Sequence, residues 1–264
     1  MMDTYEVYAI RYGAREGRTR RDSFVFPDRP NEPHPIDYYI WVIRNDDRTV
    51  LVDTGYDHRE GEARNRPVFL QPAEALAEIG VRPDGLDSIV VTHLHYDHAG
   101  GLEHFPGARI HLQDAEMAYA TGRCMCTDHL REPFTAGHVC EAVRRVYSGL
   151  CTFHDGDGFI APGITLHRIG GHSRGLQCVR VETERGPVVL ASDASHFYEN
   201  FEREMPFPIV VDVEDMLAGF RRLRELAGPT GVVVPGHDPL VRERFRPAFE
   251  GAKVDVRRLD LGEV

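Results

Sequence analysis

The amino-acid sequence predicts an α/β fold in which sheets are sandwiched between helical layers. Strand-like apolar runs alternate with helix-like segments along the 264 residues, and this pattern occurs in both halves of the chain. Several of the strand-like runs are followed closely by a histidine or an aspartate. A chain of this length forms one large domain or two modest ones and can bury a sizeable core.

The first half of the chain begins with strands and then alternates helices with strands. The apolar patterns predict strands at 5–12, 37–44, 49–53, 88–92 and 109–112. Helices are expected at 72–79, 114–120 and 136–148, with irregular material between the last two. Pro72 suits the first turn of its helix, and Gly80 suits the position just after its end.

The second half resumes with strands and contains the longest expected helix. Strands are predicted at 163–168, 177–182, 188–191 and 231–234. Between the last two, residues 213–227 carry apolar side chains at a spacing that gives a helix one buried face, namely Met216, Leu217, Phe220, Leu223 and Leu226. The alternation therefore continues to the end of the chain.

Composition excludes several classes of partner. The formal net charge is −11 and no basic stripe is present, which disfavours nucleic acid and anionic membranes. No apolar run has the length of a membrane span, and the first residues lack the apolar core of a signal peptide. We therefore expect a cytoplasmic protein with no membrane partner.

The cysteine and lysine content argues against a disulfide framework and against Schiff-base catalysis. Five scattered cysteines argue against a disulfide framework and fit a reducing compartment. Cys124 and Cys126, with Asp128 and His129, offer an alternative metal cluster, but their one-residue spacing is unlike the usual structural zinc pairs. The sequence contains a single lysine, Lys253, near its end, which disfavours a Schiff-base mechanism.

One short motif concentrates metal-binding side chains. Directly after the apolar run 88–91, six residues contain His93, His95, Asp97 and His98. Because side chains alternate along a strand, the first two histidines point to one side, while the aspartate and third histidine follow one turn later and can face a second position. The pattern H-x-H-x-D-H favours metal binding over a histidine-rich turn. The small residues 99–101 that follow allow close approach of the backbone.

Three further candidate ligands share the same context, each closely following an apolar strand. They are His172, Asp193 and His237. Taken singly, each is equally compatible with a plain turn, but together they converge if the strands end at one edge. The full set of five histidines and two aspartates suffices for two metal ions with one bridging carboxylate.

On these residues the sequence resembles the metallo-β-lactamase superfamily. The matching motifs are HLHYDH at 93–98, Gly171-His172, Asp193, Gly236-His237 and, upstream, Asp53 in LVDTG. They occur in order over roughly residues 35–240. The resemblance implies a four-layer αβ/βα sandwich, with residues 1–264 as one hydrolase domain and a cap insertion around 113–150. Within the insertion, Arg123–Gly137 is the expected cover of the substrate, with Phe134 or Met125 lining it.

The resemblance also implies metal-binding roles. It assigns one metal to His93, His95 and His172, and a second to Asp97, His98 and His237, with Asp193 bridging. Zinc is the default divalent ion for this donor set, although iron, manganese or cobalt suits the same ligands. Asp53 either orients a ligating histidine or closes a turn with Thr54 and Gly55, and the first interpretation is favoured.

The segment after Asp193 bears on the substrate. DASHFYENFEREMPFP, residues 193–208, looks like the branch of quorum-quenching N-acyl homoserine lactone lactonases, which typically carry a tyrosine three residues after the bridging aspartate. This chain has His196 there and Tyr198 two residues later. The resemblance implies attack of a metal-bound hydroxide on a small lactone or ester, with Asp97 moving the proton. His196 or Tyr198 would stabilise the oxyanion.

Alternatives remain at the level of sequence. The same site suits a thioester, as in glyoxalase II, or a cyclic amide. A redox di-iron protein is less favoured, because it usually has a carboxylate in place of one histidine and an added flavodoxin domain. The oligomeric state is open, with a homodimer as one candidate. We expect the histidines without a strand-end context to be surface or satisfied core residues, namely His104, His111, His129, His138, His154 and His167.

Overall fold

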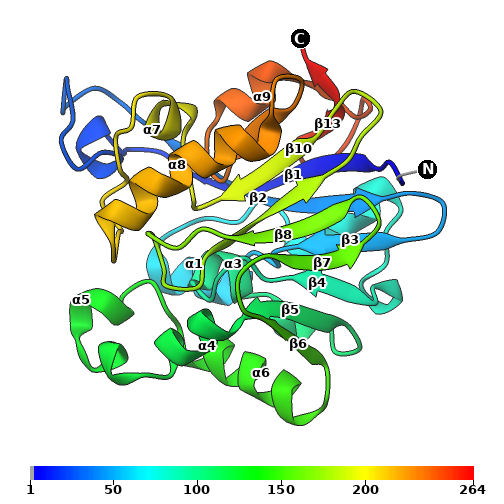
Figure 1. Cartoon of the computed structure of the whole chain (residues 1–264), viewed down its shortest axis with the longest axis horizontal. Helices are drawn as coiled ribbons and strands as arrows, with labels where there is room; N and C mark the ends of the chain where they lie inside the picture. Colours follow the sequence, from blue (N-terminus) through cyan, green and yellow to red (C-terminus); the bar gives the residue numbers. More distant parts are fainter. Residues whose placement is uncertain (1–2) are drawn as a thin grey trace.

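The computed structural model describes residues 3–264, which form two sheets packed face to face between helices (Figure 1). The larger sheet has eight strands in the order β12 (Phe245–Pro247), β13 (Val256–Glu263), β1 (Glu6–Arg15), β2 (Ile36–Arg44), β3 (Thr49–Val52), β4 (Ser88–Val90), β5 (Arg109–Gln113) and β6 (Cys151–His154). The smaller has β11 (Val232–Pro235), β10 (Val188–Ser192), β9 (Gln177–Val181), β8 (Ile164–Arg168) and β7 (Gly158–Ala161).

Helices cover the outer face of each sheet, which confirms the predicted αβ/βα sandwich. The larger sheet is covered by α2 (Pro72–Ala75), which continues as the 3₁₀ turn η2 (Leu76–Ile79), and by α4 (Asp114–Ala120) and α6 (Ala136–Tyr147). The smaller sheet is covered by α8 (Val213–Ala227), with α7 (Tyr198–Glu202) beside it. Figure 1 shows α8 on one side of the paired sheets and α4 and α6 on the other.

The remaining helical segments are short. They are α1 (His58–Arg64), α3 (Tyr96–Ala99), α5 (Asp128–Arg131) and α9 (Leu240–Arg244), with the 3₁₀ turns η1 (Arg20–Asp22), η3 (Pro83–Gly85), η4 (Leu102–His104) and η5 (Arg123–Cys126). Among residues 3–264, none of the helices is long and apolar enough to cross a membrane.

Strand β2 shows how the sequence builds two core layers. Its side chains alternate between faces, as in any strand. Tyr39, Trp41 and Ile43 pack in the core between the two sheets, whereas Ile40 and Val42 pack in the core beneath the helices of the larger sheet. Because both faces are buried, the strand is an almost continuous apolar run rather than an alternating one.

Strand direction brings the predicted ligand positions to one edge. Strands β3 and β4 are parallel, so the residues after Val52 and after Val90 lie at the same end of the larger sheet. In the smaller sheet β10 and β11 are parallel, and β9 runs antiparallel to both β8 and β10. The chain therefore leaves β8, β10 and β11 at one end as well.

The structure departs from the expected elements in several places. Helix 72–79 divides into an α-helical turn and a 3₁₀ turn, ending at Gly80 in the left-handed conformation with φ 72°. The material expected to be irregular between 120 and 136 contains α5 and η5. Strands β6, β7, β12 and β13 were not expected, because they are short or, in VRRLDLGE of β13, interrupted by charged residues. Pairing with β1 makes β13 a strand.

Candidate metal centre

The structure brings all seven predicted ligands together at the end of the sheets. Two groups of ligand atoms within 4.8 Å of one another contain His93, His95, His172 and Asp193, and Asp97, His98 and His237. Each of these seven residues is at most 9% exposed. The two groups match the ligand sets that the family resemblance assigns, and a third, overlapping group joins Asp193 to His196 and His237. Metal ligation by these residues remains a prediction.

Asp193 lies between the two groups and turns one oxygen toward each. Its Oδ2 is 3.1 Å from Nε2 of His172 and 3.8 Å from Nε2 of His93. Its Oδ1 is 2.9 Å from Nε2 of His237 and 3.2 Å from Nε2 of His98. A carboxylate whose two oxygens face separate sets of nitrogens has the geometry of a bridge.

Hydrogen bonds to backbone carbonyls fix the ring orientation of two histidines. Nδ1 of His172 donates to the carbonyl of Ile209 at 2.7 Å, and Nδ1 of His237 donates to the carbonyl of Asp37 at 2.8 Å. In both rings Nε2 then carries the lone pair and faces Asp193. His95 differs, because it presents Nδ1, which is 2.9 Å from Nε2 of His172. Partners that fix the tautomer in this way are typical of histidines that bind metal.

Asp53 orients a third histidine and the motif that carries it. Its Oδ2 lies 2.7 Å from Nδ1 of His98, so Nε2 of that ring faces the cluster. The same carboxylate accepts from the amide of Thr92 at 2.7 Å and from its hydroxyl at 2.8 Å. This geometry agrees with an orienting role rather than a simple turn. Asp53 has φ 60° and Ser192, directly before Asp193, has φ 47°, so the backbone is strained on both sides of the centre.

Small residues allow the loops of the centre to touch. A Cβ atom on Gly101 would lie 2.5 Å from the carbonyl oxygen of Thr54, so any larger residue there would push the HxHxDH segment away from Asp53. A Cβ on Gly236 would lie 2.9 Å from Oδ1 of Asp193. These contacts bear out the expectation that the glycines serve close backbone approach.

Unpartnered nitrogens show that the cluster fits metal ions. Nε2 of His93 and Nε2 of His98 are buried, and neither has a hydrogen-bond partner within residues 3–264. Burial lowers the pKa of His93 and His95 well below the usual value, so both rings are neutral and able to ligate. Burial also opposes protonation of His98, but Asp193, Asp53 and Asp97 outweigh it and raise its pKa, so ligation there would displace a proton.

His196 also contacts the cluster. Its Nε2 is 2.9 Å from Oδ2 of Asp193, and its Nδ1 is buried without a partner among the described residues. The ring stacks on Phe207 with centroids 3.5 Å apart and planes 6° apart. Burial lowers its pKa to about 3, so the ring is neutral and its one N–H can donate to Asp193.

Tyr198 does not reach the centre. It lies in α7 and packs in the core between the sheets, and the guanidinium carbon of Arg244 lies 3.7 Å from its ring centroid. Its hydroxyl is not among the atoms that line the cavity at the cluster, and the ring instead borders a different hollow together with His34. The sequence could not distinguish the two candidates, because only the turn before α7 decides which side chain faces Asp193.

A cavity of about 80 Å³ opens at the cluster, and sequence analysis missed most of its wall. Arg15, Arg18, Tyr38, Arg66 and Tyr96 line it together with cluster residues. They come from the end of β1 and the loop after it, from β2 and from the chain around α1 and α3. Except for Tyr96, which stands inside the HxHxDH motif, no signal near the predicted ligands pointed to them.

Part of the expected cover also borders the cavity. Glu132 and Pro133 line it, and the ring of Phe134 lies edge-on against His95 with centroids 4.6 Å apart. Met125 is not among the lining residues; its carbonyl accepts from Arg131. The segment 123–137 therefore touches the centre through its second half.

Glu116 links two of the ligand loops and was not foreseen. It is fully buried on α4, and Oε1 accepts from the amide of Leu94, between His93 and His95, at 2.9 Å. Its Oε2 accepts from the hydroxyl of Ser173 at 2.6 Å and from the amide of Gly175 at 2.9 Å, beside His172. One carboxylate thus holds the loops that carry three ligands. A lone acidic residue within an ordinary helical segment gave no signal of this.

The cysteines fit the expectation of ordinary thiols. All five are free, and Cys178 is buried in the core. Cys124 and Cys126 do not belong to any group of candidate ligands among residues 3–264.

Comparison with known proteins places the site in a family context. The model of the metallo-β-lactamase superfamily matches residues 35–237. An N-acyl homoserine lactonase of Bacillus sp is 31% identical over 225 residues, which cover 79% of this chain and 84% of that protein.

Solved structures of lactonases are also similar to this chain. A quorum-quenching N-acyl homoserine lactone lactonase superposes with a TM-score of 0.79 at 27% identity, covering 93% of this chain and 98% of that one. An N-acyl homoserine lactone hydrolase with the product N-hexanoyl-L-homoserine at its catalytic metal centre superposes with a TM-score of 0.77 at 26% identity, covering 93% and 98%.

Proposed function

The chain belongs to the metallo-β-lactamase superfamily and is a metal-dependent hydrolase, and we propose that it opens a lactone ring at a two-metal centre. The observation that carries the proposal is the division of the Asp193 oxygens between two sets of histidine nitrogens. The lactonases among its relatives support a lactone substrate, either an N-acyl homoserine lactone or a related small lactone.

Seven side chains would hold the two divalent ions. His93, His95 and His172 would bind one, Asp97, His98 and His237 the other, and Asp193 both. The donor set suits zinc first, and iron, manganese or cobalt as well. When bound, such a pair of ions polarises a substrate carbonyl and lowers the pKa of bound water toward neutrality.

The protein's own residues would position the ligands and move the proton. Asp97 lines the cavity, and its oxygens lie 3.8 Å from Nε2 of His98 and 3.9 Å from Nε2 of His237. It is therefore the carboxylate placed to accept a proton and pass it to the departing alkoxide. Asp53 would keep the His98 lone pair aimed at the centre.

His196 would act on Asp193 rather than on the substrate carbonyl. Its Nε2–H donates to the bridging carboxylate, which leaves no N–H for a carbonyl oxygen. Of the two tyrosines that line the cavity, Tyr38 accepts a hydrogen bond from the hydroxyl of Tyr96 at 3.3 Å and keeps its own proton free to donate. Burial raises the pKa of Tyr38, so it stays protonated at neutral pH and is a donor for the developing oxyanion.

We include the insertion 113–150 in this proposal as a cover for the substrate. Its residues Glu132 and Pro133 form one wall of the cavity, and Phe134 packs against His95. A lactone bound over the cluster would be held between this segment and the side chains of the β1 loop. Exclusion of water by such a cover strengthens the electrostatic interactions inside.

Metal analysis combined with a lactone assay tests the proposal. Purified protein should contain about two divalent ions per chain. It should open N-acyl homoserine lactones or small γ-lactones with release of one proton per ring, followed with a pH indicator. Chelation should abolish turnover, and Zn²⁺ should restore it. Fully loaded protein that opens no acyl or aromatic lactone, but cleaves a glutathione thioester or a cyclic amide, would replace the lactonase with one of those hydrolases.

A further inference from the structure

The cavity at the metal centre has a wall of arginines. Arg15, Arg18 and Arg66 line it. Arg18 is only 7% exposed: Nη2 donates to the carbonyl of Asp22, while Nη1 is buried and has no hydrogen-bond partner within the described chain. Arg66 donates from Nη1 to the hydroxyl of Tyr96, and its Nε is likewise buried without a partner in residues 3–264.

The carboxylates near these arginines do not neutralise them. Glu132 lines the cavity, but its side chain is 61% exposed and lies 3.6 Å from Arg64 instead. Asp97 and Asp193 belong to the metal centre. Asp22 meets Arg18 through its carbonyl, while its carboxylate accepts from Thr19. Burial, Arg15 and Arg66 lower the pKa of Arg18, and the opposing influence of Tyr38 and Asp22 does not restore its usual value.

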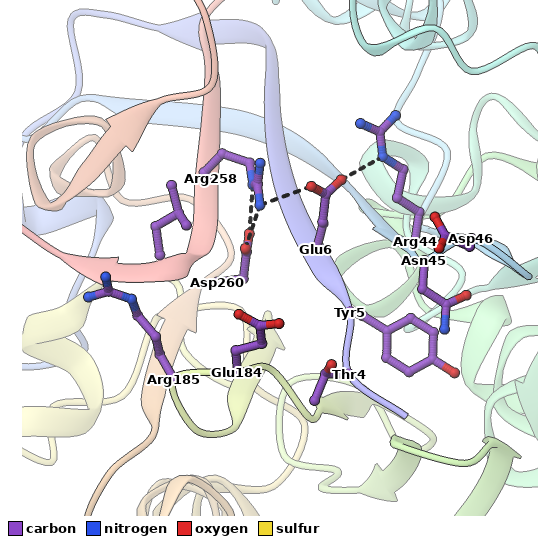
Figure 2. A pocket seen from close by; sticks show the side chains of 11 residues that line it. Thr4, Tyr5, Glu6, Arg44, Asn45, Asp46, Glu184, Arg185, Arg258 and Asp260 are labelled. Atoms are coloured by element: carbon purple, nitrogen blue, oxygen red, sulfur yellow. Dashed lines mark hydrogen bonds and ion pairs between the residues drawn. The ribbon is translucent and has the colours of Figure 1, made fainter. Parts of the chain in front are cut away.

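A second hollow of about 510 Å³ is lined by Arg44, Arg185 and Arg258, and two of these arginines form ion pairs (Figure 2). There Arg258 lies 3.1 Å from Glu6 and 2.6 Å from Asp260, and Arg44 lies 2.9 Å from Glu6. In Figure 2 dashed lines join Arg258 to Glu6 and Asp260, and Nε of Arg44 to Glu6. Those arginines are compensated within the protein, whereas Arg18, the more deeply buried, keeps an unpaired nitrogen.

Burying a guanidinium nitrogen without a partner costs free energy, so a ligand that supplies the hydrogen-bond acceptor binds more tightly. The planar fork of arginine matches the two oxygens of a carboxylate. Ile36, Pro133, Phe207 and Ile209 add apolar surface to this wall, but the cavity holds only about 80 Å³. This composition suits a short, negatively charged substituent better than a long acyl chain.

We infer that the substrate carries a carboxylate, which Arg18 binds with the help of Arg66 while the ring is presented to the metal centre. This inference rests on the proposed lactonase function and narrows it to anionic lactones. Arg18 is then a specificity residue: it contacts the substituent and takes no part in breaking the ester bond. The loop after β1, which carries it, selects the substrate, and the strand ends supply the chemistry.

The test compares two lactones that differ only in charge, 5-oxotetrahydrofuran-2-carboxylate and its carboxamide. For the zinc-loaded wild-type protein we expect kcat/KM for the acid to exceed that for the amide about ten-fold or more. In Arg18→Gln this ratio should fall to near one, mainly through a higher KM for the acid, with Arg18→Lys intermediate. Arg82→Gln, at a side chain that is 80% exposed and paired with Asp84, is the matched control and should keep the wild-type ratio.

Two checks separate the outcomes. Circular dichroism and metal content establish that Arg18→Gln is folded and loaded. Equal kcat/KM for acid and amide in the wild type, or an unchanged ratio in Arg18→Gln, overturns the inference while leaving the lactonase in place. If no lactone is opened at all, the lactonase proposal fails, and calorimetric titration with cyclopentanecarboxylate and cyclopentanecarboxamide still tests the anion site. Tighter binding of cyclopentanecarboxylate than of cyclopentanecarboxamide, lost in Arg18→Gln, supports the anion site. Equal binding of the two compounds refutes it.

Discussion

Two groups of histidines in this protein differ in what surrounds them. Six histidines gather around Asp193 at the sheet ends, and all six are buried. His111 and His154, on the adjacent strands β5 and β6, stack with ring centroids 5.3 Å apart. In this pair Nδ1 of His111 lies 3.0 Å from Nε2 of His154, so the two rings satisfy one another.

The contrast shows which features indicate a metal centre. Both groups are sheltered, and burial lowers the pKa of histidines in both, that of His111 to about 4. The site differs by its central carboxylate, by second partners that fix ring orientation, and by nitrogens without partners among the described residues. Proximity of histidines alone therefore does not indicate a metal site, and the four predictions below test this distinction.

The largest effect is expected from Asp193→Asn. Removing one charge and one oxygen acceptor from the bridge should reduce metal content from about two to at most one per chain and lower kcat/KM about a thousand-fold or more. Elemental analysis and the lactone assay measure both quantities. His111→Gln, in the other group, should retain both metals. If the Asp193→Asn protein retains two metal ions and full activity, the assignment of Asp193 as the bridging ligand is wrong.

A smaller loss is expected from Asp53→Asn, which leaves every proposed ligand in place. The change removes the charge that fixes the His98 tautomer, and such partners are worth about ten- to hundred-fold in metal affinity or activity. Competition with a chelator of known affinity measures the loss. The surface variant Asp84→Asn serves as control and should behave as wild type. An Asp53→Asn protein with unchanged zinc affinity would reduce Asp53 to a turn residue.

Glu116→Gln should have a milder effect on the same centre. The amide can accept at one position only, so either Leu94 or the Ser173 and Gly175 pair loses its acceptor. We expect metal affinity to fall about ten-fold, at the lower end of the range for such partners. Asp114→Asn, two residues earlier on α4 and exposed, is the matched control. Equal chelator titrations for the two variants would contradict a positioning role for Glu116.

The smallest effect concerns the histidine pair and the stability of the fold. Because the folded-state pKa of His111 is about 4, below the usual 6.5, the unfolded chain binds a proton that the folded chain excludes as pH falls from 6.5 toward 4. His111 therefore does not lower the free energy of unfolding above pH 6.5, and it destabilises the folded state increasingly as the pH falls below 6.5. From pH 7 to pH 5 the free energy of unfolding should fall in both proteins, but by about 1 kcal/mol less in His111→Gln than in wild type. This figure is reduced because His111 is partly exposed to solvent.

Urea unfolding at the two pH values, with zinc in excess, measures this difference. The metal content and lactone activity of His111→Gln serve as internal controls, since both should match wild type. Identical pH dependence in the two proteins would show that the pair does not exclude protons in the folded state.

Local sequence patterns predict the layered fold and the seven candidate ligands. Both follow from local patterns: alternation and apolar runs define strands such as β2 and β4, and a strand end places the next polar residue at a sheet edge. His93 and Asp193 could therefore be identified without knowing which strands are neighbours. The weakly patterned strands β6, β7 and β13 could not be predicted, because their conformation depends on pairing with other strands rather than on their own residues.

The surroundings of the ligands depend on tertiary packing. Arg18 comes from the loop after β1, more than seventy residues before His93, and Glu116 reaches two loops from a helix that looks ordinary in sequence. The choice of His196 over Tyr198 depended on the turn that leads into α7. These contacts join segments that no local periodicity relates, since they arise from how the two sheets and their loops pack. The metal chemistry could thus be inferred locally, whereas substrate selection required the assembled cavity.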